Sequence, residues 1–517
     1  MVKRIENERL PKGWIKVPIG DTGDYINGFA FKPSHRGTQG LPIIRIQNLT
    51  NEAKPFNLTK LTVPPEYHIE TGDMLMSWSA TLDVFVWQRE PALVNQHIFK
   101  VVPDSRIIEK RLLFHWLKLA IQQLLETDHL HGSTMMHINR GPFMAHEVPL
   151  PPRAEQTRIV EKLEELLSDL DAGVVELKAA QKKLGQYRQS LLKAAVEGVL
   201  TADWRESQKS QKTKPAESGA ELLKRILHER RTRWEAKQLA KFKEQGKTPA
   251  KGWQVKYLEP VAPETAGLPE LPKGWVWASA EQLCDFITKG TTPSKGLDGA
   301  GDKVIPFLRV TNLTDKGELD MADKVFVSEE THRGFLARSV VYPNDVLMNI
   351  VGPPLGQVSV VPETFAEWNI NQAIAIFRAV DGVLPSFLSL NLLAPTAQHW
   401  LKARSKTTAG QTNLTLEVCR SLPIPLPPVV EQHELVCFAN VSINAVADQL
   451  LAIQISLKQA TAQRKNILKA AFSGQLVPQD PQDEPASALL ARIRAERVKQ
   501  GALPKVRKSK IRKDAHA

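Results

Sequence analysis

Three segments have residue types that could support chemistry on a nucleotide or a base. Gly352-Pro353-Pro354-Leu355 partly matches an Asn/Asp-Pro-Pro-aromatic loop, which binds a flipped base, but it lacks both the polar acceptor and the stacking ring. Gly246-Lys247-Thr248 has the end of a phosphate-binding loop, yet Lys241 stands where the first Gly is required. The Gly-rich stretch 296–302 is not followed by Lys-Ser/Thr. We interpret the first segment as a rigid turn and the last as a flexible loop, and we assign no catalytic residue.

Histidines cluster in the first half of the chain, where Asp128 is the only obvious carboxylate near them. The corresponding stretch of the second half, 402–414, has no His, so we predict polar or DNA-facing histidines rather than a metal site. A Ser-His-Asp arrangement stays possible, but no GxSxG elbow supports one. The clustered histidines are His115, His129, His131, His137 and His146.

Polar loops offer recognition chemistry instead. Reading base edges requires short polar or forked side chains on loops that enter a groove. Two loops of the first half, 32–40 and 133–140, and two of the second half, 289–303 and 406–413, have such residues. For each loop an ordinary solvated loop is the competing interpretation. The candidate DNA-binding residues are Lys32, His35, Arg36, Gln39, Ser133, Thr134, Asn139, Arg140, Lys289, Thr291, Thr292, Lys295, Lys406, Thr407, Gln411 and Asn413.

Length and charge limit the classes of protein. A chain of 517 residues exceeds one core, and 42% hydrophobic with 24% charged residues is typical of a folded soluble protein. The net charge of +12 favours an anionic partner, most often nucleic acid. Most of the excess lies in 205–256, with 15 Lys and Arg against 6 Asp and Glu, and in 491–517, with 10 against 2. The three cysteines form no CxxC pair, and we expect no signal peptide and no membrane-spanning stretch.

The most informative feature is an internal repeat. Leu10-Pro11-Lys12-Gly13-Trp14 recurs 261 residues later as Leu271-Pro272-Lys273-Gly274-Trp275. From Asn95-Gln96 and Asn371-Gln372 onward the offset is constant at 276. The same offset of 276 separates the motif Pro149-Leu150-Pro151-Pro152-x-x-Glu155-Gln156 from its copy, Pro425-Leu426-Pro427-Pro428-x-x-Glu431-Gln432. Each half therefore has a globular part with variable loops and a helical part of fixed length.

Each Pro-rich connector leads into a long heptad pattern, which predicts two helices of about 40 residues, or ~60 Å, that pack as a coiled coil. Gly198 and Gly474 lie where a left-handed C-cap would end these helices. Ordinary core packing is the alternative, but two in-frame copies of equal length favour a spacer. The predicted seam residues are Leu163, Leu170, Leu177, Leu184, Leu191, Ile443, Leu450, Leu457 and Ile467.

A third repeat follows each long helix. Leu222-Leu223 with Arg225-Ile226 recurs as Leu489-Leu490 with Arg492-Ile493, and a solvated and a docking helix are equally compatible with it. The globular parts contain short β-branched stretches and helical segments, which predict α/β-mixed domains. Predicted strands are 43–46, 84–87, 97–102, 358–361 and 374–377, and predicted helices are 109–126 and 386–393.

In these doubled motifs the chain resembles the specificity subunit of a type I restriction–modification system. The helix ends Leu-Lys-Ala-Ala-Val-Glu-Gly-Val-Leu and Leu-Lys-Ala-Ala-Phe-Ser-Gly-Gln-Leu add to the resemblance, as does the Gly290-Thr291-Thr292-Pro293 turn. It implies an α+β fold with two target-recognition domains, separated by an antiparallel coiled coil with pseudo-twofold internal symmetry. The first half lacks the Gly-Thr-Thr-Pro turn, so the two domains are expected to read different sequences.

The resemblance also implies an organisation and partners. We expect recognition domains at 1–152 and 257–428, spacer helices at 153–204 and 429–477, a basic linker with a charged helix at 205–256, and a charged helix with a basic tail at 478–517. Expected partners are double-stranded DNA, two modification (methyltransferase) subunits and restriction (motor-nuclease) subunits, in a prokaryotic cytoplasm and without a membrane. S-adenosylmethionine, ATP and Mg are expected on the partners, with no cofactor or metal on this chain. Two alternatives are a single-chain restriction–methylation enzyme and a coiled-coil DNA scaffold without base readout.

Overall fold

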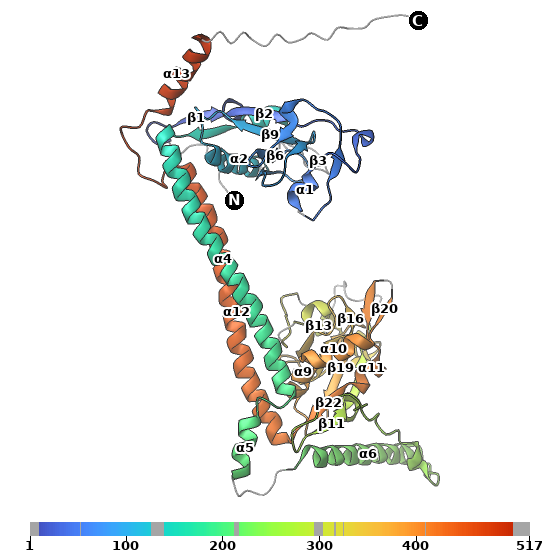
Figure 1. Cartoon of the computed structure of the whole chain (residues 1–517). Coiled ribbons are helices and arrows are strands. Elements are labelled where there is room, and N and C mark those ends of the chain that lie inside the picture. The colour runs from blue at the N-terminus through green and yellow to red at the C-terminus, as the bar shows by residue number, and fades with distance from the viewer. Residues whose placement is uncertain are drawn as a thin grey trace, which may run out of the picture. The chain divides into compact units, whose positions relative to one another are not determined.

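The computed structural model describes residues 10–51, 53–125, 139–210, 217–293, 303–314, 317–323, 325–408 and 410–499. The chain divides into two compact units, Met1–Leu177 with Ile455–Ala517, and Lys178–Gln454. Each unit contains one globular domain together with adjoining parts of the two long helices, α4 (Arg153–Val196) and α12 (Val429–Phe472) (Figure 1).

The domain of the first unit has a central four-stranded antiparallel sheet of order β2-β9-β6-β7. One face packs on α2, where Met74, Phe99 and Trp116 share a core, and the other packs on the sheet β4-β3-β8-β5 through Leu75 and Ile98. Strand β1 pairs antiparallel with β10. The elements are β1 (Ile15–Pro18), η1 (Ile19–Asp21), β2 (Gly23–Asn27), η2 (Pro33–His35), β3 (Leu41–Ile44), α1 (Ile46–Thr50), β4 (Asn57–Thr59), η3 (Pro65–Tyr67), β5 (His68–Ile69), β6 (Met74–Ser77), β7 (Asp83–Val86), β8 (Ala92–Val94), β9 (Ile98–Pro103), α2 (Lys110–Leu125), α3 (Arg140–Ala145) and β10 (Glu147–Leu150).

The domain of the second unit repeats this plan with a central sheet of order β12-β19-β15-β17. One face packs on α9 through Met348, Phe377 and Phe387, and the other packs on β13 and β18 through Leu347 and Ile376. Its elements are β11 (Val276–Ser279), α7 (Ala280–Leu283), β12 (Cys284–Lys289), β13 (Lys303–Leu308), η5 (Val310–Asn312), β14 (Phe326–Ser328), α8 (Glu329–Arg333), η6 (Ala337–Ser339), β15 (Val346–Asn349), β16 (Val351–Gly352), β17 (Val358–Val360), β18 (Asn369–Ile370), β19 (Ile374–Ala379), α9 (Pro385–Leu393), α10 (Pro395–Arg404), β20 (Lys406–Thr408), β21 (Gln411–Asn413), α11 (Leu416–Ser421) and β22 (Pro423–Leu426).

The two long helices have 44 residues each and start 276 positions apart, as the constant offset predicts. In the first unit the beginning of α4 packs against the end of α12, where Leu163 and Ile467 share one core. In the second unit the end of α4 packs against the beginning of α12, where Leu192 and Leu435 share another. The helices are therefore antiparallel within each unit. Gly198 and Gly474, with φ of +71° and +69°, follow the helix ends in the left-handed conformation.

The doubled sequence motifs make equivalent hydrogen bonds. Trp14 Nε1 donates to Glu155 Oε2 at 2.9 Å, and Trp275 Nε1 donates to Glu431 Oε2 at the same distance. Gln156 Nε2 donates to the Ile107 carbonyl, whereas Gln432 Nε2 donates to Gly382, each at 3.0 Å. The Glu-Gln pair at the start of each long helix thus fastens the helix to its own domain.

The third repeat forms two helices that dock on the domains. These are α6 (Gly219–Glu244) in the second unit and α13 (Ala486–Lys499) in the first. Gly219 N donates to the Gly274 carbonyl, and Ala486 N donates to the Gly13 carbonyl. Because Leu222, Ile226, Leu489, Leu490 and Ile493 are all buried, the docking interpretation is confirmed for this repeat. Two shorter elements complete the linker region, α5 (Ala202–Ser210) and η4 (Trp253–Lys256).

Three expectations need correction. The strand predicted at 43–46 ends at Ile44, because the Asn48 side chain accepts a hydrogen bond from Arg45 N and caps a short helix there. The loop predicted at 406–413 is a β-hairpin, β20–β21. Helix α12 contains an 18-residue window of mean hydropathy 1.5, long and apolar enough by length and composition to cross a membrane. Such a single helix is weak evidence of a membrane span, since apolar helices of soluble proteins share these properties.

Candidate nucleic-acid interface

One polar surface of the second unit starts where β12 ends. Gly290, which follows β12, lies very close to the turn at Asn371-Gln372. A Cβ at position 290 would be 2.2 Å from the Asn371 carbonyl oxygen, so only Gly fits. Gly28 has the same role in the first unit, with a Cβ placed 2.1 Å from the Asn95 carbonyl oxygen. In both domains this Gly therefore brings the loop after the strand against the repeated Asn-Gln turn.

Side-chain contacts extend this surface. Arg338 Nη2 donates to Thr291 Oγ1 at 2.8 Å, and Thr292 Oγ1 donates to Gln372 Oε1. Arg338, Thr292 and Gln372 are exposed, and so is Lys289 at the end of β12. Three segments far apart in the sequence thus present hydroxyl, amide and cationic groups together, which are the groups that contact base edges and phosphates.

The β20–β21 hairpin continues the same surface. Strand β21 pairs with β16. Ile350, the residue before β16, donates its backbone N–H to the carbonyl of Ala373 at 2.8 Å, and Ala373 directly follows Gln372. Lys406, Thr407 and Gln411 are exposed on this hairpin, and Asn413 is half-buried. The structure therefore brings together Lys289, Thr291, Thr292 and the hairpin residues, while Lys295 lies outside the described residues.

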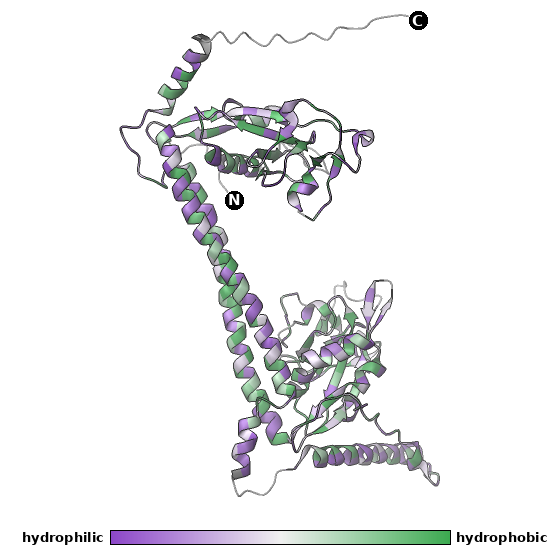
Figure 2. Cartoon of the chain, viewed as in Figure 1, coloured by the Kyte–Doolittle hydropathy of each residue, from purple (hydrophilic) through white to green (hydrophobic). Residues whose placement is uncertain are grey.

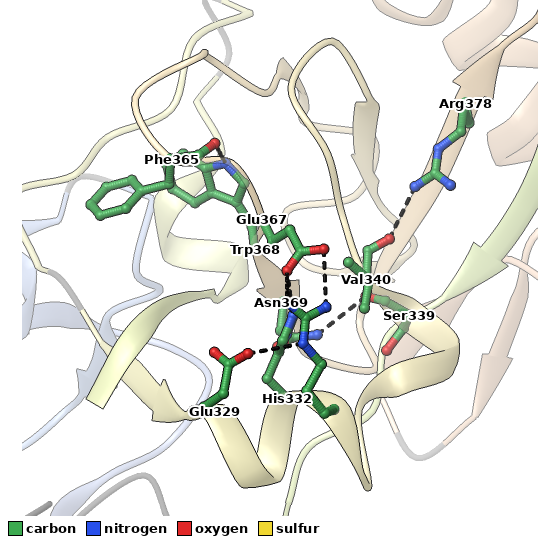
Figure 3. A network of polar contacts seen from close by, with 10 residues as sticks. Glu329, His332, Ser339, Val340, Phe365, Glu367, Trp368, Asn369 and Arg378 are labelled. Carbon is green, nitrogen blue, oxygen red and sulfur yellow. Dashed lines mark hydrogen bonds and ion pairs between the residues drawn. The ribbon is translucent and has the colours of Figure 1, made fainter. Parts of the chain in front are cut away.

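A buried network supports the segment that includes Arg338 (Figure 3). His332 is fully buried, with Nδ1 2.6 Å from Asn369 Oδ1 and Nε2 3.0 Å from Glu367 Oε2. The hydrogen bond from Arg333 lowers the pKa of Glu367 and keeps the carboxylate ionised. The network fastens α8 to β18, and Asn369 Nδ2 also donates to the Ser339 carbonyl, next to Arg338.

The candidate residues of the first unit lie on the loop around η2. Lys32 N donates to His35 Nδ1 at 3.2 Å, and Lys32, Arg36 and Gln39 are exposed. Gly37 N donates to the Leu58 carbonyl at 2.7 Å, which fixes the loop to β4. Ser133 and Thr134 lie outside the described residues. Asn139 and Arg140 are exposed at the start of α3, where Arg140 Nη2 donates to the Tyr25 carbonyl.

Sequence reasoning missed a second group of polar residues in the first unit. Trp78 Nε1 donates to Asn27 Oδ1 at 3.1 Å, and the Trp78 and His97 rings lie 5.3 Å apart. Gln96 Nε2 is 3.3 Å from His97 Nε2. Gln96 and Gln372 occupy equivalent positions in the repeat, so the doubled Asn-Gln pair was the signal that could have identified this site and Gln372.

The structure places the other chemical candidates in structural roles. Burial lowers the pKa of His115 to about 4, which keeps this imidazole neutral, and His146 Nε2 is 3.0 Å from Gln123 Oε1. His129, His131 and His137 lie outside the described residues. Within the part of the chain that the structure describes, no group of three His, Cys, Asp or Glu residues could hold a metal ion. The Gly352-Pro353-Pro354-Leu355 segment connects β16 and β17, and Asn349 Nδ2 donates to the Pro354 carbonyl.

Two domains of one architecture, each with polar side chains beside its repeated Asn-Gln turn, are typical of a DNA-recognition protein. The chain belongs to the family described as type I restriction modification DNA specificity domain, whose family model matches residues 11–181 and 272–445. Members of this family are non-catalytic recognition components.

Similar proteins cover almost the whole chain. The Type I restriction enzyme EcoBI specificity subunit of Escherichia coli is 27% identical over 513 residues, covering 96% of this chain and 94% of that protein. The Type I restriction enzyme EcoKI specificity subunit of Escherichia coli strain K12 is 23% identical, covering 97% and 99%. A chain solved in a study of complex assembly and conformational transition of the type I R-M system shares the fold, with a TM-score of 0.61, 18% identity and coverage of 91% and 100%.

Proposed function

We propose that this chain reads a bipartite, asymmetric DNA site for a type I restriction–modification complex, with one half-site for each globular domain. The observation that carries the proposal is the repeated architecture with unlike polar surfaces. The second unit presents Thr292 and Arg338 beside Gln372, whereas the first presents Trp78 and His97 beside the equivalent Gln96. Equivalent frames with different donors and acceptors suit two different base sequences.

In this proposal the paired helices set the unread spacer between the half-sites. Each domain is fastened to the start of its own helix by the Trp–Glu and Gln contacts, and it packs against the end of the other helix. Helix length is therefore coupled to domain position at both ends. The central seam residues Leu177, Leu184, Leu450 and Leu457 are half-buried, which fits a two-helix seam open to solvent on its sides.

The helices also offer a docking face for the modification subunits. Val430, Val441 and Leu451 of α12 are 50%, 68% and 54% exposed. The equivalent α4 positions, 276 residues earlier, hold Ala154, Glu165 and Val175, of which only Val175 is a large exposed apolar residue, at 66%. Exposed apolar side chains on a helix that is otherwise solvated are typical of protein interfaces. The greener α12 and the more hydrophilic α4 in Figure 2 agree with this difference.

Catalysis belongs to the partners in this proposal. The modification subunits would bind S-adenosylmethionine and methylate adenine, and the restriction subunits would use ATP and Mg, all in the bacterial cytoplasm. Methyl transfer by the purified chain alone would contradict this division of work and support the single-chain enzyme. Equal affinity for specific and random duplexes would support the scaffold without base readout.

The direct test is methylome sequencing of cells that express the complex with and without this chain. We expect a two-part methylated motif only when the chain is present. Variants of the second surface, such as Gln372→Ala, should change or relax one half of the motif, and His97→Ala should affect only the other half. A motif that changes in both halves with either variant would contradict separate reading.

A further inference from the structure

The basic linker forms an ordered projection on the second unit that the proposed function does not use. Helix α6 has 26 residues, and only its first part packs on the domain. Arg230 Nη1 donates to the Glu281 carbonyl at 2.8 Å, and Arg233 forms an ion pair with Asp285 at 3.1 Å. The remainder, with the returning chain to Lys256, is hereafter called the α6 knob (residues 236–256).

An aromatic core that includes the neighbouring residues Trp234 and Tyr257 holds the α6 knob together. The Trp234 and Trp253 rings stack with centroids 5.7 Å apart, and Phe242 meets Trp253 edge-on at 5.9 Å. Tyr257 lies 5.3 Å from Trp234, and the Arg231 guanidinium lies over the Tyr257 ring. The returning segment is therefore fixed against the helix, which gives the knob a defined surface.

That surface is strongly cationic. Six lysines against one acidic residue, Glu244, lie between positions 236 and 256. All six are exposed, and none has a salt bridge among the ion pairs of the described residues. The lysines are Lys237, Lys241, Lys243, Lys247, Lys251 and Lys256.

We propose that the α6 knob binds the phosphate backbone of DNA outside the half-site that the second domain reads. This inference rests on the proposed function. Lysine is depleted in protein–protein interfaces, whereas clustered lysines neutralise phosphates without reading sequence. Within the second unit, α6 packs beside β11 and β22, and the β20 hairpin lies at the opposite end of the domain (Figure 1). The phosphates bound by the knob are therefore flanking ones.

The test compares salt dependence on two duplexes. Binding of the assembled complex is measured from 50 to 300 mM salt, on a duplex trimmed to the mapped site and on one with long flanks. The variant is Lys237→Gln/Lys241→Gln/Lys243→Gln/Lys247→Gln. On the flanked duplex, loss of two or three phosphate contacts should reduce the slope of log affinity against log salt concentration by about 1.8 to 2.7. Affinity for the flanked duplex at 0.15 M salt should fall roughly 30- to 170-fold, and affinity for the trimmed duplex should not change.

A matched control keeps the charge and removes the exposed apolar residues of the same region. Val255 and Leu258 are 85% and 87% exposed, so Val255→Ser/Leu258→Ser should fold normally and leave the slope unchanged. If that variant loses complex assembly and the Lys variant keeps its slope, the knob binds protein and the inference is wrong. An equal loss on both duplexes would also overturn it. Absence of any specific preference in the unaltered chain would instead refute the proposed function.

Discussion

The two Trp–Glu contacts should differ in stability although their sequence motifs are alike. Glu431 is 2% exposed and accepts hydrogen bonds from Trp275 Nε1, Thr201 Oγ1 at 2.7 Å and Arg205 Nη1. Glu155 accepts one from Trp14 Nε1, and its Oε1 is buried with no hydrogen-bond partner among the residues that the structure describes. The second carboxylate is thus fully paired, whereas the first is not.

The perturbation is Glu431→Gln, with Glu155→Gln as its matched control. Removing the charge from Glu431 leaves the Arg205 guanidinium without its buried partner, and it should cost about 2 to 3 kcal/mol. At 1.4 kcal/mol for each factor of ten, local opening should become roughly 30- to 140-fold more frequent. Glu155→Gln removes an under-paired buried charge, so the first unit should lose no stability or gain some.

The pH dependence has a definite sign. Burial raises the pKa of Glu155 in the folded state above its value in the unfolded chain. Its protonated form therefore contributes stability that is fully present below the unfolded pKa and is lost as the pH rises through the folded pKa. Glu155→Gln should remove this decline in the first unit.

Amide hydrogen exchange of the full chain measures both units separately. Peptides that include Trp275 and Gly219 should exchange faster in Glu431→Gln, and peptides around Trp14 should not do so in Glu155→Gln. Equal acceleration by the two substitutions, or none by Glu431→Gln, would refute the reasoning.

Three further predictions follow from packing and exposure. Gly290→Ala should disorder the loop beside Asn371 and relax methylation at one half-site only, whereas Gly141→Ala, with open space around it, should leave the methylome unchanged. Val441→Glu should weaken binding of the modification subunits in a pull-down, and Val441→Ile should not. Among the cysteines, Cys437 is exposed, whereas burial raises the pKa of Cys419 to about 12 and also raises the pKa of Cys284. One thiol per native chain should therefore react with a maleimide, as mass spectrometry would show, and rapid labelling of all three would contradict this burial.

The repeat made the helical frame predictable. A constant offset of 276 predicted two helices of equal length, and a Gly at each end predicted the caps, because helix length and cap geometry depend on local sequence. The strand predicted through Ile46 was wrong because the Asn48 side chain accepts a hydrogen bond from Arg45 N and donates to the Lys54 and Pro55 carbonyls. These are local side-chain to backbone contacts that strand propensity does not include.

The recognition surface was less predictable than the frame. Thr291 and Thr292 were predicted from a polar loop. Arg338, 47 residues away, also contacts Thr291, and it lies next to Ser339, whose carbonyl is hydrogen-bonded to the buried His332–Asn369 network. Spatial neighbours of this kind have no fixed sequence spacing. The pair Asn371-Gln372 was detected as part of the repeat, and its position at the surface required the fold.

The most direct test of the two-domain account is to insert one heptad into both long helices at equivalent positions and to map the methylated motif of the complex. Seven residues lengthen each helix by about 10.5 Å, which corresponds to roughly three base pairs of duplex. We expect both half-site sequences to be unchanged and the unread spacer between them to increase by that amount. Altered half-sites at a constant spacer would contradict the account.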